Sequence, residues 1–179
     1  MNEYKSYGHN PPHLFIPNAK YFITVSTYNK KPFLKSSVAK EKLYDSLQIE
    51  FYKHKRIIED WVILDNHYHL MVNAPSSPCT LPEIFKEAHR FTALWIKKNL
   101  NIDSIKIFHN YWDTCITYEK SYFGRLNYLW YNPVKHGYVD SPEKGKFGSY
   151  YYRFIEDEIK MKNLLIKYPF DKIKIYDDF

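Results

Sequence analysis

The sequence is poor in cysteine and glycine and has no long apolar run. Two cysteines in 179 residues are too few for a disulfide framework, and Cys79 and Cys115 lack the spacing of a metal site. Five glycines form no Gly-rich phosphate loop, which argues against a Rossmann-like parallel sheet. No stretch approaches the roughly 18 apolar residues of a membrane helix, and residues 1–17 do not have the apolar core of a signal peptide. These absences predict a cytoplasmic protein without a membrane partner.

Aromatic residues and positive charge, by contrast, are abundant. Aromatic residues make up 19% of the chain, including 18 tyrosines, so some rings should lie at the surface, where a ring can stack on a base. Lys and Arg number 26 against 20 Asp and Glu, for a net charge of +6. Residues 1–40 contain six lysines and one acidic residue, so the positive excess lies at the front. This distribution favours an anionic partner, although a solvated positive surface has the same composition.

Hydrophobic periodicity predicts one α+β domain with the order β-α-β-β-α-β-α. A chain of 179 residues is long enough to bury one sizeable core. The turn-prone pair Asp65-Asn66 joins two of the strands, which favours a central antiparallel sheet covered by helices. Pro133 is expected to end the third helix, because the residue before proline avoids the helical region. Strands are expected at 21–28, 57–64, 67–72 and 110–118, and helices at about 36–52, from Thr80 onward, at 120–131 and near 155–166.

The periodicity of the first two helices also predicts which side chains are buried. The first is expected to bury Val38, Leu43, Leu47 and Phe51, and the second Ile84, Ala88, Phe91 and Trp95. Cationic side chains fall on another face of the second helix, namely those of Lys86, Arg90 and Lys97.

Two histidines stand two residues apart in a predicted strand, in the segment Asn66-His67-Tyr68-His69. Residues two apart on a strand project from the same face, so His67 and His69 present two imidazoles side by side. Neutral imidazole is a good ligand for divalent metals. The alternative is that both histidines are ordinary polar residues on a solvated sheet face.

A tyrosine and an asparagine stand four residues apart near the end of the third predicted helix. Tyr128 and Asn132 therefore lie on one helix face. A tyrosine hydroxyl can attack phosphorus, and an amide oxygen can serve as a third hard ligand beside the histidines. The alternative interpretation makes Tyr128 a core aromatic residue and Asn132-Pro133 a helix stop.

Together these motifs resemble the single-tyrosine HUH transposases of bacterial insertion sequences, especially the REP-associated tyrosine transposases. The resemblance covers roughly residues 20–153 in the right order. It rests on the two histidines at 67–69, the tyrosine before Asn132-Pro133-Val134-Lys135-His136-Gly137, and three further segments: Tyr21-Phe22-Ile23-Thr24-Val25-Ser26, Tyr111-Trp112-Asp113 and Phe147-Gly148-Ser149-Tyr150-Tyr151. Two positions depart from the family pattern. Asp65 stands where proline is common, and Phe108-His109 stands where a Trp-Gln pair is common.

The resemblance implies a ferredoxin-like or RRM-like arrangement of the α+β fold and a metal-dependent transesterase acting on single-stranded DNA. It implies that Tyr128 is the nucleophile, with Tyr131 as the second choice, and that His67, His69 and Asn132 hold Mg²⁺ or Mn²⁺. The substrate would be hairpin-bearing DNA such as REP-like elements or insertion-sequence ends, and the protein would be associated with the nucleoid. Lysines and an arginine would line a DNA groove: Lys30, Lys31, Lys35, Lys86, Arg90 and Lys97.

Several alternatives stay open at this point. The chain could be a non-catalytic nucleic-acid binder on the same fold, or a metal-dependent phosphodiesterase whose nucleophile is water. Relatives include monomers and homodimers, and the resemblance to the REP-associated branch favours the monomer. We expect one catalytic domain over residues 1–153, including a basic N-terminal arm, and a C-terminal extension over residues 154–179.

Overall fold

The computed structural model describes residues 16, 18–74 and 80–168. Its centre is a four-stranded antiparallel sheet with the strand order β2-β3-β1-β4. The strands are β1 (Lys20–Thr27), β2 (Ile58–Ile63), β3 (His67–Asn73) and β4 (Phe108–Ile116). The predicted α+β class with a central antiparallel sheet is therefore confirmed. Cys79 and most of the predicted N-terminal arm lie outside the described residues.

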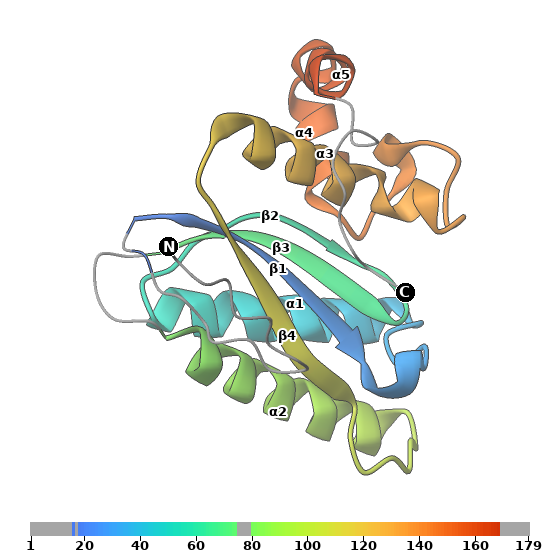
Figure 1. Cartoon of the computed structure of the whole chain (residues 1–179). Coiled ribbons are helices and arrows are strands. Elements are labelled where there is room, and N and C mark those ends of the chain that lie inside the picture. The colour runs from blue at the N-terminus through green and yellow to red at the C-terminus, as the bar shows by residue number, and fades with distance from the viewer. Residues whose placement is uncertain (1–15, 17, 75–79, 169–179) are drawn as a thin grey trace.

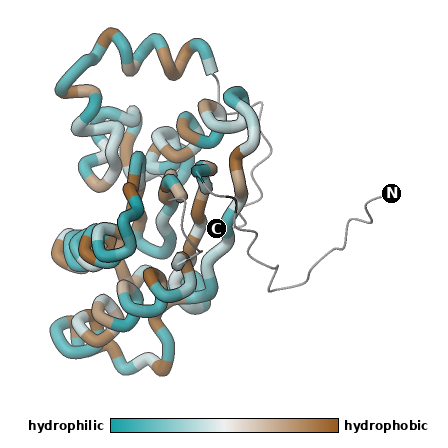
Figure 2. Tube along the Cα trace, turned by 90° about the vertical axis from the view of Figure 1, so that its left-hand side faces the viewer, coloured by the Kyte–Doolittle hydropathy of each residue, from teal (hydrophilic) through white to brown (hydrophobic). Residues whose placement is uncertain are grey.

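Helices cover both faces of this sheet (Figure 1). Apolar residues recur among polar ones along the helices (Figure 2), as expected of helices that bury one side. Two clusters of buried residues, one on each side of the sheet, form the core. The first face carries α1 (Ser37–Lys53) and α2 (Leu81–Asn99), and the second carries α3 (Glu119–Lys135), α4 (Ser149–Glu156) and α5 (Glu158–Lys167). None of the described helices has the length and apolar character of a membrane span.

Helix α1 begins as the sequence predicts, and its buried face differs from the predicted one at a single residue. The Oγ of Ser36 accepts a hydrogen bond from the backbone N–H of Ala39 (3.2 Å), which caps the helix. Leu43 and two later predicted residues are buried, but the prediction for Val38 was wrong, because its side chain is 52% exposed. Ala39 is buried instead, since it lies one turn before Leu43 on the same helix face.

Helix α2 buries most of the predicted stripe. Ile84 and Ala88 are buried as expected and Trp95 is partly buried against the core, but the prediction for Phe91 was wrong, because its side chain is 41% exposed. The buried stripe continues through Thr92 and Ile96, four residues apart. Thr80 stands at the N-cap position, but its side chain forms no capping hydrogen bond.

Helix α3 continues through Pro133, so the predicted helix end was wrong. The helix ends instead at a Schellman motif, in which Gly137 has a φ of +71°. The backbone N–H of Gly137 donates to the carbonyl of Val134 (3.0 Å), and the N–H of Tyr138 donates to the carbonyl of Pro133 (2.9 Å). Burial of Trp130 and its neighbours against the sheet holds the helix past the proline.

The C-terminal part of the described chain contains two helices where one was predicted near residues 155–166. Asp157 separates α4 from α5, and its carboxylate accepts a hydrogen bond from the backbone N–H of Lys160 (3.0 Å), capping α5. Met161 of α5 is buried in the same hydrophobic cluster as Leu129 and Trp130 of α3. Residue 153 lies within α4, and the division into a catalytic domain and an extension stays a prediction.

Candidate active site

His67 and His69 lie on the face of β3 that is directed toward α3. Strand alternation places Tyr68 and Leu70 on the other face, in the core beneath α1 and α2. His67 is 1% exposed and His69 is 0% exposed. The alternative of two polar residues on a solvated sheet face is therefore excluded.

The surroundings of both imidazoles hold them in the neutral form. Burial lowers the pKa of His67 to about 3, and the nearby positive groups of His136 and Lys135 act in the same direction. Burial also lowers the pKa of His69 well below its usual value. Neutral imidazole is the protonation state that binds a metal ion.

One nitrogen of each ring is held by a polar side chain. Nδ1 of His67 lies 2.8 Å from Oδ1 of Asn66, and Nδ1 of His69 lies 2.9 Å from Oγ1 of Thr24 on β1. A hydrogen bond at Nδ1 directs the Nε2 lone pair outward, as in many metal-binding histidines. Phe22 stacks on the His69 ring with 5.3 Å between ring centroids, which further fixes the orientation of that ring.

Helix α3 brings Tyr128 and Asn132 onto the two histidines. Oδ1 of Asn132 lies 3.0 Å from Nε2 of His67, and the Tyr128 ring centroid lies 5.5 Å from that of His69. The four residues predicted to form the centre of the site therefore meet in one place within a single chain. Tyr128 is 4% exposed, so burial alone is compatible with a core ring as well, and its role as the nucleophile stays a prediction.

Two further residues at this site were not predicted. Nζ of Lys135 donates a hydrogen bond to Oη of Tyr128 (3.1 Å), and burial lowers the pKa of Lys135. The His136 ring centroid lies 4.8 Å from that of His67. Spacing could have indicated Lys135, because positions seven apart share one helix face, but a helix that ends before Pro133 does not extend to Lys135.

Two of the predicted ligand atoms have the separation expected of neighbouring ligands on a divalent ion, which is also the separation of a hydrogen bond. Adjacent ligands of an octahedral ion lie about 3.0 Å apart when each bond is about 2.1 Å, and Nε2 of His67 and Oδ1 of Asn132 have this separation. Nδ2 of Asn132 is buried without a hydrogen-bond partner in the described part of the chain, so this amide orientation is maintained at the cost of a hydrogen bond. No cluster of three or more His, Cys, Asp or Glu residues suited to a metal occurs among the described residues.

The cations predicted to bind DNA fall into two separate groups. The loop that carries Lys30, Lys31 and Lys35 is fastened to the turn before His67, where Nδ2 of Asn66 donates to the carbonyl of Lys30 (3.4 Å). The other group lies on α2, on the far side of the sheet from α3 (Figure 1). The structure therefore does not bring Lys86, Arg90 and Lys97 to the histidines. Arg90 also forms an ion pair with Glu87 on its own helix (2.7 Å).

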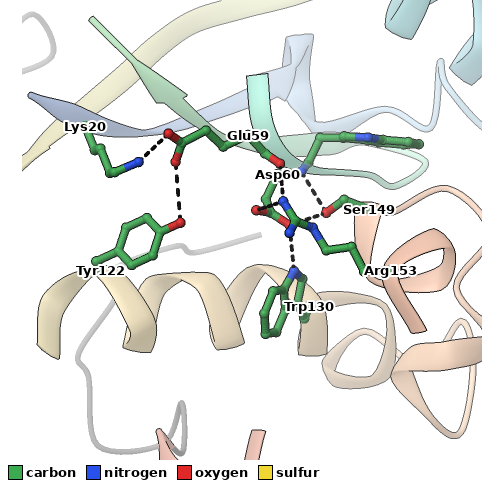
Figure 3. Close-up of polar contacts among 8 residues, drawn as sticks. Lys20, Glu59, Asp60, Tyr122, Trp130, Ser149 and Arg153 are labelled. Carbon is green, nitrogen blue, oxygen red and sulfur yellow. Dashed lines mark hydrogen bonds and ion pairs between the residues drawn. The ribbon is translucent and has the colours of Figure 1, made fainter. Parts of the chain in front are cut away.

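A buried carboxylate, that of Asp60 on β2, fixes α3 and α4 to the sheet (Figure 3). Nε1–H of Trp130 on α3 donates to Oδ1 of Asp60 (3.0 Å). From α4, the Ser149 hydroxyl donates to Oδ1 (2.8 Å), and the Arg153 guanidinium donates to Oδ2 (2.8 Å). Burial raises the pKa of Asp60, while Arg153, Ser149 and Trp130 oppose that shift. Because Trp130 lies between Tyr128 and Asn132 in sequence, this carboxylate sets the position of both over the histidines.

Replacing Asp60 with alanine is expected to lower the free energy of unfolding by about 2 to 5 kcal/mol. The change leaves the buried indole N–H of Trp130 and the hydroxyl of Ser149 without an acceptor, and each such group costs about 1 to 3 kcal/mol. Urea denaturation measures the effect. Glu59→Ala is the control, because Glu59 is the adjacent residue on β2. Its carboxylate pairs with the half-exposed Lys20 and accepts a long hydrogen bond from the Tyr122 hydroxyl (3.4 Å), contacts that together contribute about 1 to 2 kcal/mol. Equal losses in the two variants would contradict the anchoring role of Asp60.

Known proteins are similar to this chain in sequence and in fold. No family model matches the chain. The REP-associated tyrosine transposase of Escherichia coli (strain K12) is 26% identical over 156 residues, which cover 84% of this chain and 84% of that protein. A solved structure of the REP-associated tyrosine transposase bound to a REP hairpin superposes with a TM-score of 0.67 at 21% identity, covering 100% of this chain and 95% of the other. In sequence and in fold, the chain is thus similar to the REP-associated tyrosine transposases, and the resemblance predicted from its motifs is confirmed.

Proposed function

We propose that this chain cleaves and rejoins single-stranded DNA through a covalent phosphotyrosine formed by Tyr128, on DNA that contains a hairpin. The observation that carries the proposal is the convergence of Tyr128, Asn132, His67 and His69 at one buried centre. The similarity to a REP-associated tyrosine transposase, whose structure was solved with a REP hairpin, supports the same substrate class.

The chemistry is a transesterification that conserves the phosphodiester energy. Oη of Tyr128 attacks the scissile phosphorus, the bond from phosphorus to the 3′ oxygen breaks, and that oxygen takes up a proton to leave a 3′-hydroxyl. The reverse attack by a 3′-hydroxyl reseals a strand and frees the tyrosine. Storage of the bond as a phosphotyrosine allows rejoining without nucleotide hydrolysis.

The surrounding side chains would favour the charged oxygens of this reaction. Lys135 donates to Oη of Tyr128 (3.1 Å), and an ammonium in this position stabilises negative charge on the attacking oxygen. His67, His69 and Asn132 would hold a divalent ion, Mg²⁺ or Mn²⁺. The bound ion would supply charge neutralisation at the scissile phosphate. The buried Asp60 network would keep Tyr128 and Asn132 in place while DNA binds.

The deciding experiment is to trap the covalent intermediate. Wild-type protein is incubated with a hairpin oligonucleotide that has single-stranded flanks and a label on the 3′ side, in the presence of Mn²⁺, and then denatured. A labelled protein band that resists denaturation, with the label mapped to a peptide containing Tyr128, is expected. Cleaved DNA without an adduct would indicate the water-dependent phosphodiesterase, and binding without cleavage would indicate the non-catalytic binder.

The salt dependence of DNA affinity should show which lysines and arginines contact the DNA backbone. A triple Lys30→Gln, Lys31→Gln, Lys35→Gln variant is expected to reduce the slope of log affinity against log salt by about 2, since each phosphate contact on a single strand contributes about 0.7. The slope is measured by fluorescence anisotropy with the hairpin oligonucleotide.

The cations of α2 offer a matched control for this measurement. A triple Lys86→Gln, Arg90→Gln, Lys97→Gln variant removes the same charge from the opposite face of the sheet, and its slope is expected to equal that of the wild type. A reduced slope in the α2 variant only would place the DNA on the other helical layer and contradict the proposed path.

A further inference from the structure

Beside the histidines lies a part of the same sheet face that α3 does not cover. It is formed by β1 and β4, and we call it the open face. Asn110, Trp112 and Thr114 on β4 are exposed, whereas Thr24 and Ser26 on β1 are half-buried. All five side chains are uncharged, so none of them repels a phosphate, and one of them is a large ring.

Strand register fixes the position of that ring relative to the candidate catalytic centre. Thr24 on β1 pairs with His69 on β3 on one side and with Trp112 on β4 on the other. Directly opposed residues in a sheet project from the same face. Trp112, Thr24 and His69 therefore form one row across three adjacent strands, and the indole lies on the face that carries the histidines.

The indole of Trp112 is 43% exposed, although the neighbouring ring of Tyr111 on the opposite face packs against the core. Among the residues that the structure describes, no aromatic ring stacks on Trp112. A large planar ring open to solvent in a row with two polar side chains is suited to stack on the face of an unpaired base.

From these observations we propose that Trp112 stacks on an unpaired base of the DNA strand in the site and thereby sets which phosphate reaches Tyr128. Strands in a sheet lie about 4.8 Å apart, so Trp112 stands roughly 10 Å from His69. At about 3.4 Å per stacked nucleotide, this distance corresponds to three nucleotides or fewer from the scissile phosphate. The proposal rests on the proposed DNA cleavage and adds the residue that positions the strand.

The test is a double-mutant cycle between the ring and individual bases. The hairpin oligonucleotide is made with a single abasic site at each successive position within three nucleotides of the cleavage point. Its affinity is measured by anisotropy in the Tyr128→Phe background, with and without Trp112→Ala. We expect Trp112→Ala to weaken binding of intact DNA by between about fivefold and about 150-fold, and to have no effect when one particular base is missing.

Two companion variants make the result specific to stacking. Trp112→Phe keeps a ring and should restore most of the affinity. Phe91→Ala on α2 removes a ring of similar exposure, 41%, from the opposite side of the sheet, and should leave affinity unchanged. In the cleavage assay, with Tyr128 intact, Trp112→Ala should also spread the cuts over neighbouring phosphates, which a loss of fold stability would not produce.

The failure of this proposal differs from a failure of the proposed function. If wild-type protein nicks the oligonucleotide and Trp112→Ala binds and cuts at the same position with the same affinity, the stacking role is refuted and the nuclease remains. An equal loss at every abasic position would also refute it. If wild-type protein neither binds nor cuts the oligonucleotide, the proposed function itself is refuted.

Discussion

Replacement of Tyr128 by phenylalanine is expected to abolish DNA nicking and the covalent adduct while leaving the affinity for single-stranded DNA nearly unchanged. The ring keeps its contacts with Phe22 (6.2 Å between centroids) and His69 (5.5 Å), so the packing of α3 is preserved. Only the nucleophilic oxygen and its hydrogen bond from Lys135 are lost, which costs about 1 kcal/mol of stability. Removal of a nucleophile lowers turnover by more than about a thousandfold.

Tyr131→Phe is the matched control for this variant, because Tyr131 lies on the same helix one turn later. Nicking of a labelled hairpin oligonucleotide and adduct formation are measured side by side, with anisotropy for binding. Tyr131→Phe should cut at the wild-type rate. An active Tyr128→Phe protein together with an inactive Tyr131→Phe protein would reassign the nucleophile.

Removal of divalent ions is the second change with a large expected effect. Excess chelator should stop nicking, and added Mn²⁺ or Mg²⁺ should restore it, while the melting temperature changes by little. The reason is that protein contacts hold both imidazoles: Asn66 and Asn132 flank His67, and Phe22 and Thr24 hold His69. Robust nicking in excess chelator would contradict the proposed metal site.

Histidine variants test the same point, with a structural cost that the chelation experiment avoids. Both rings are almost completely buried, so His67→Ala or His69→Ala leaves a cavity and should lower stability by a few kcal/mol. His67→Leu keeps much of the volume and has no atom that can bind a metal ion, so it is the better variant. Its nicking should not recover at high Mn²⁺, whereas the chelated wild type recovers, and its DNA affinity measured by anisotropy should stay close to that of the wild type.

The sequence predicted the sheet, the first three helices and the faces that carry the central residues, because each depends on local spacing. A period of two placed His67 and His69 on one face, and a spacing of four placed Tyr128 beside Asn132. The structure brings these four residues together. Their meeting across 59 or more positions in the chain was not implied by spacing and came from the family resemblance.

The features that the sequence did not reveal depend on contacts between distant segments. Pro133 does not end α3, because Pro133 itself and the preceding Asn132 are buried and Gly137 supplies the actual stop. The error concealed Lys135, which contacts Tyr128. Arg90 lies on the helical layer opposite α3. The sequence did not predict this, because helix periodicity gives a face of the helix but not the side of the sheet on which the helix packs. Trp112 could be placed in one row with Thr24 and His69 only once the pairing of three strands was known.

The buried Asp60 carboxylate has a consequence for how chains of this kind can diverge. Asp60 lies on β2, and its partners come from α3 (Trp130) and α4 (Ser149 and Arg153). A single substitution in this set leaves a buried polar group without a partner, whereas replacing the whole set by apolar residues of similar volume is nearly neutral or stabilising. Sequence drift at these positions should therefore be correlated, with related chains retaining the four residues together or exchanging them together. Such covariation would be visible between positions about 90 apart in the chain, from Asp60 to Ser149 and Arg153.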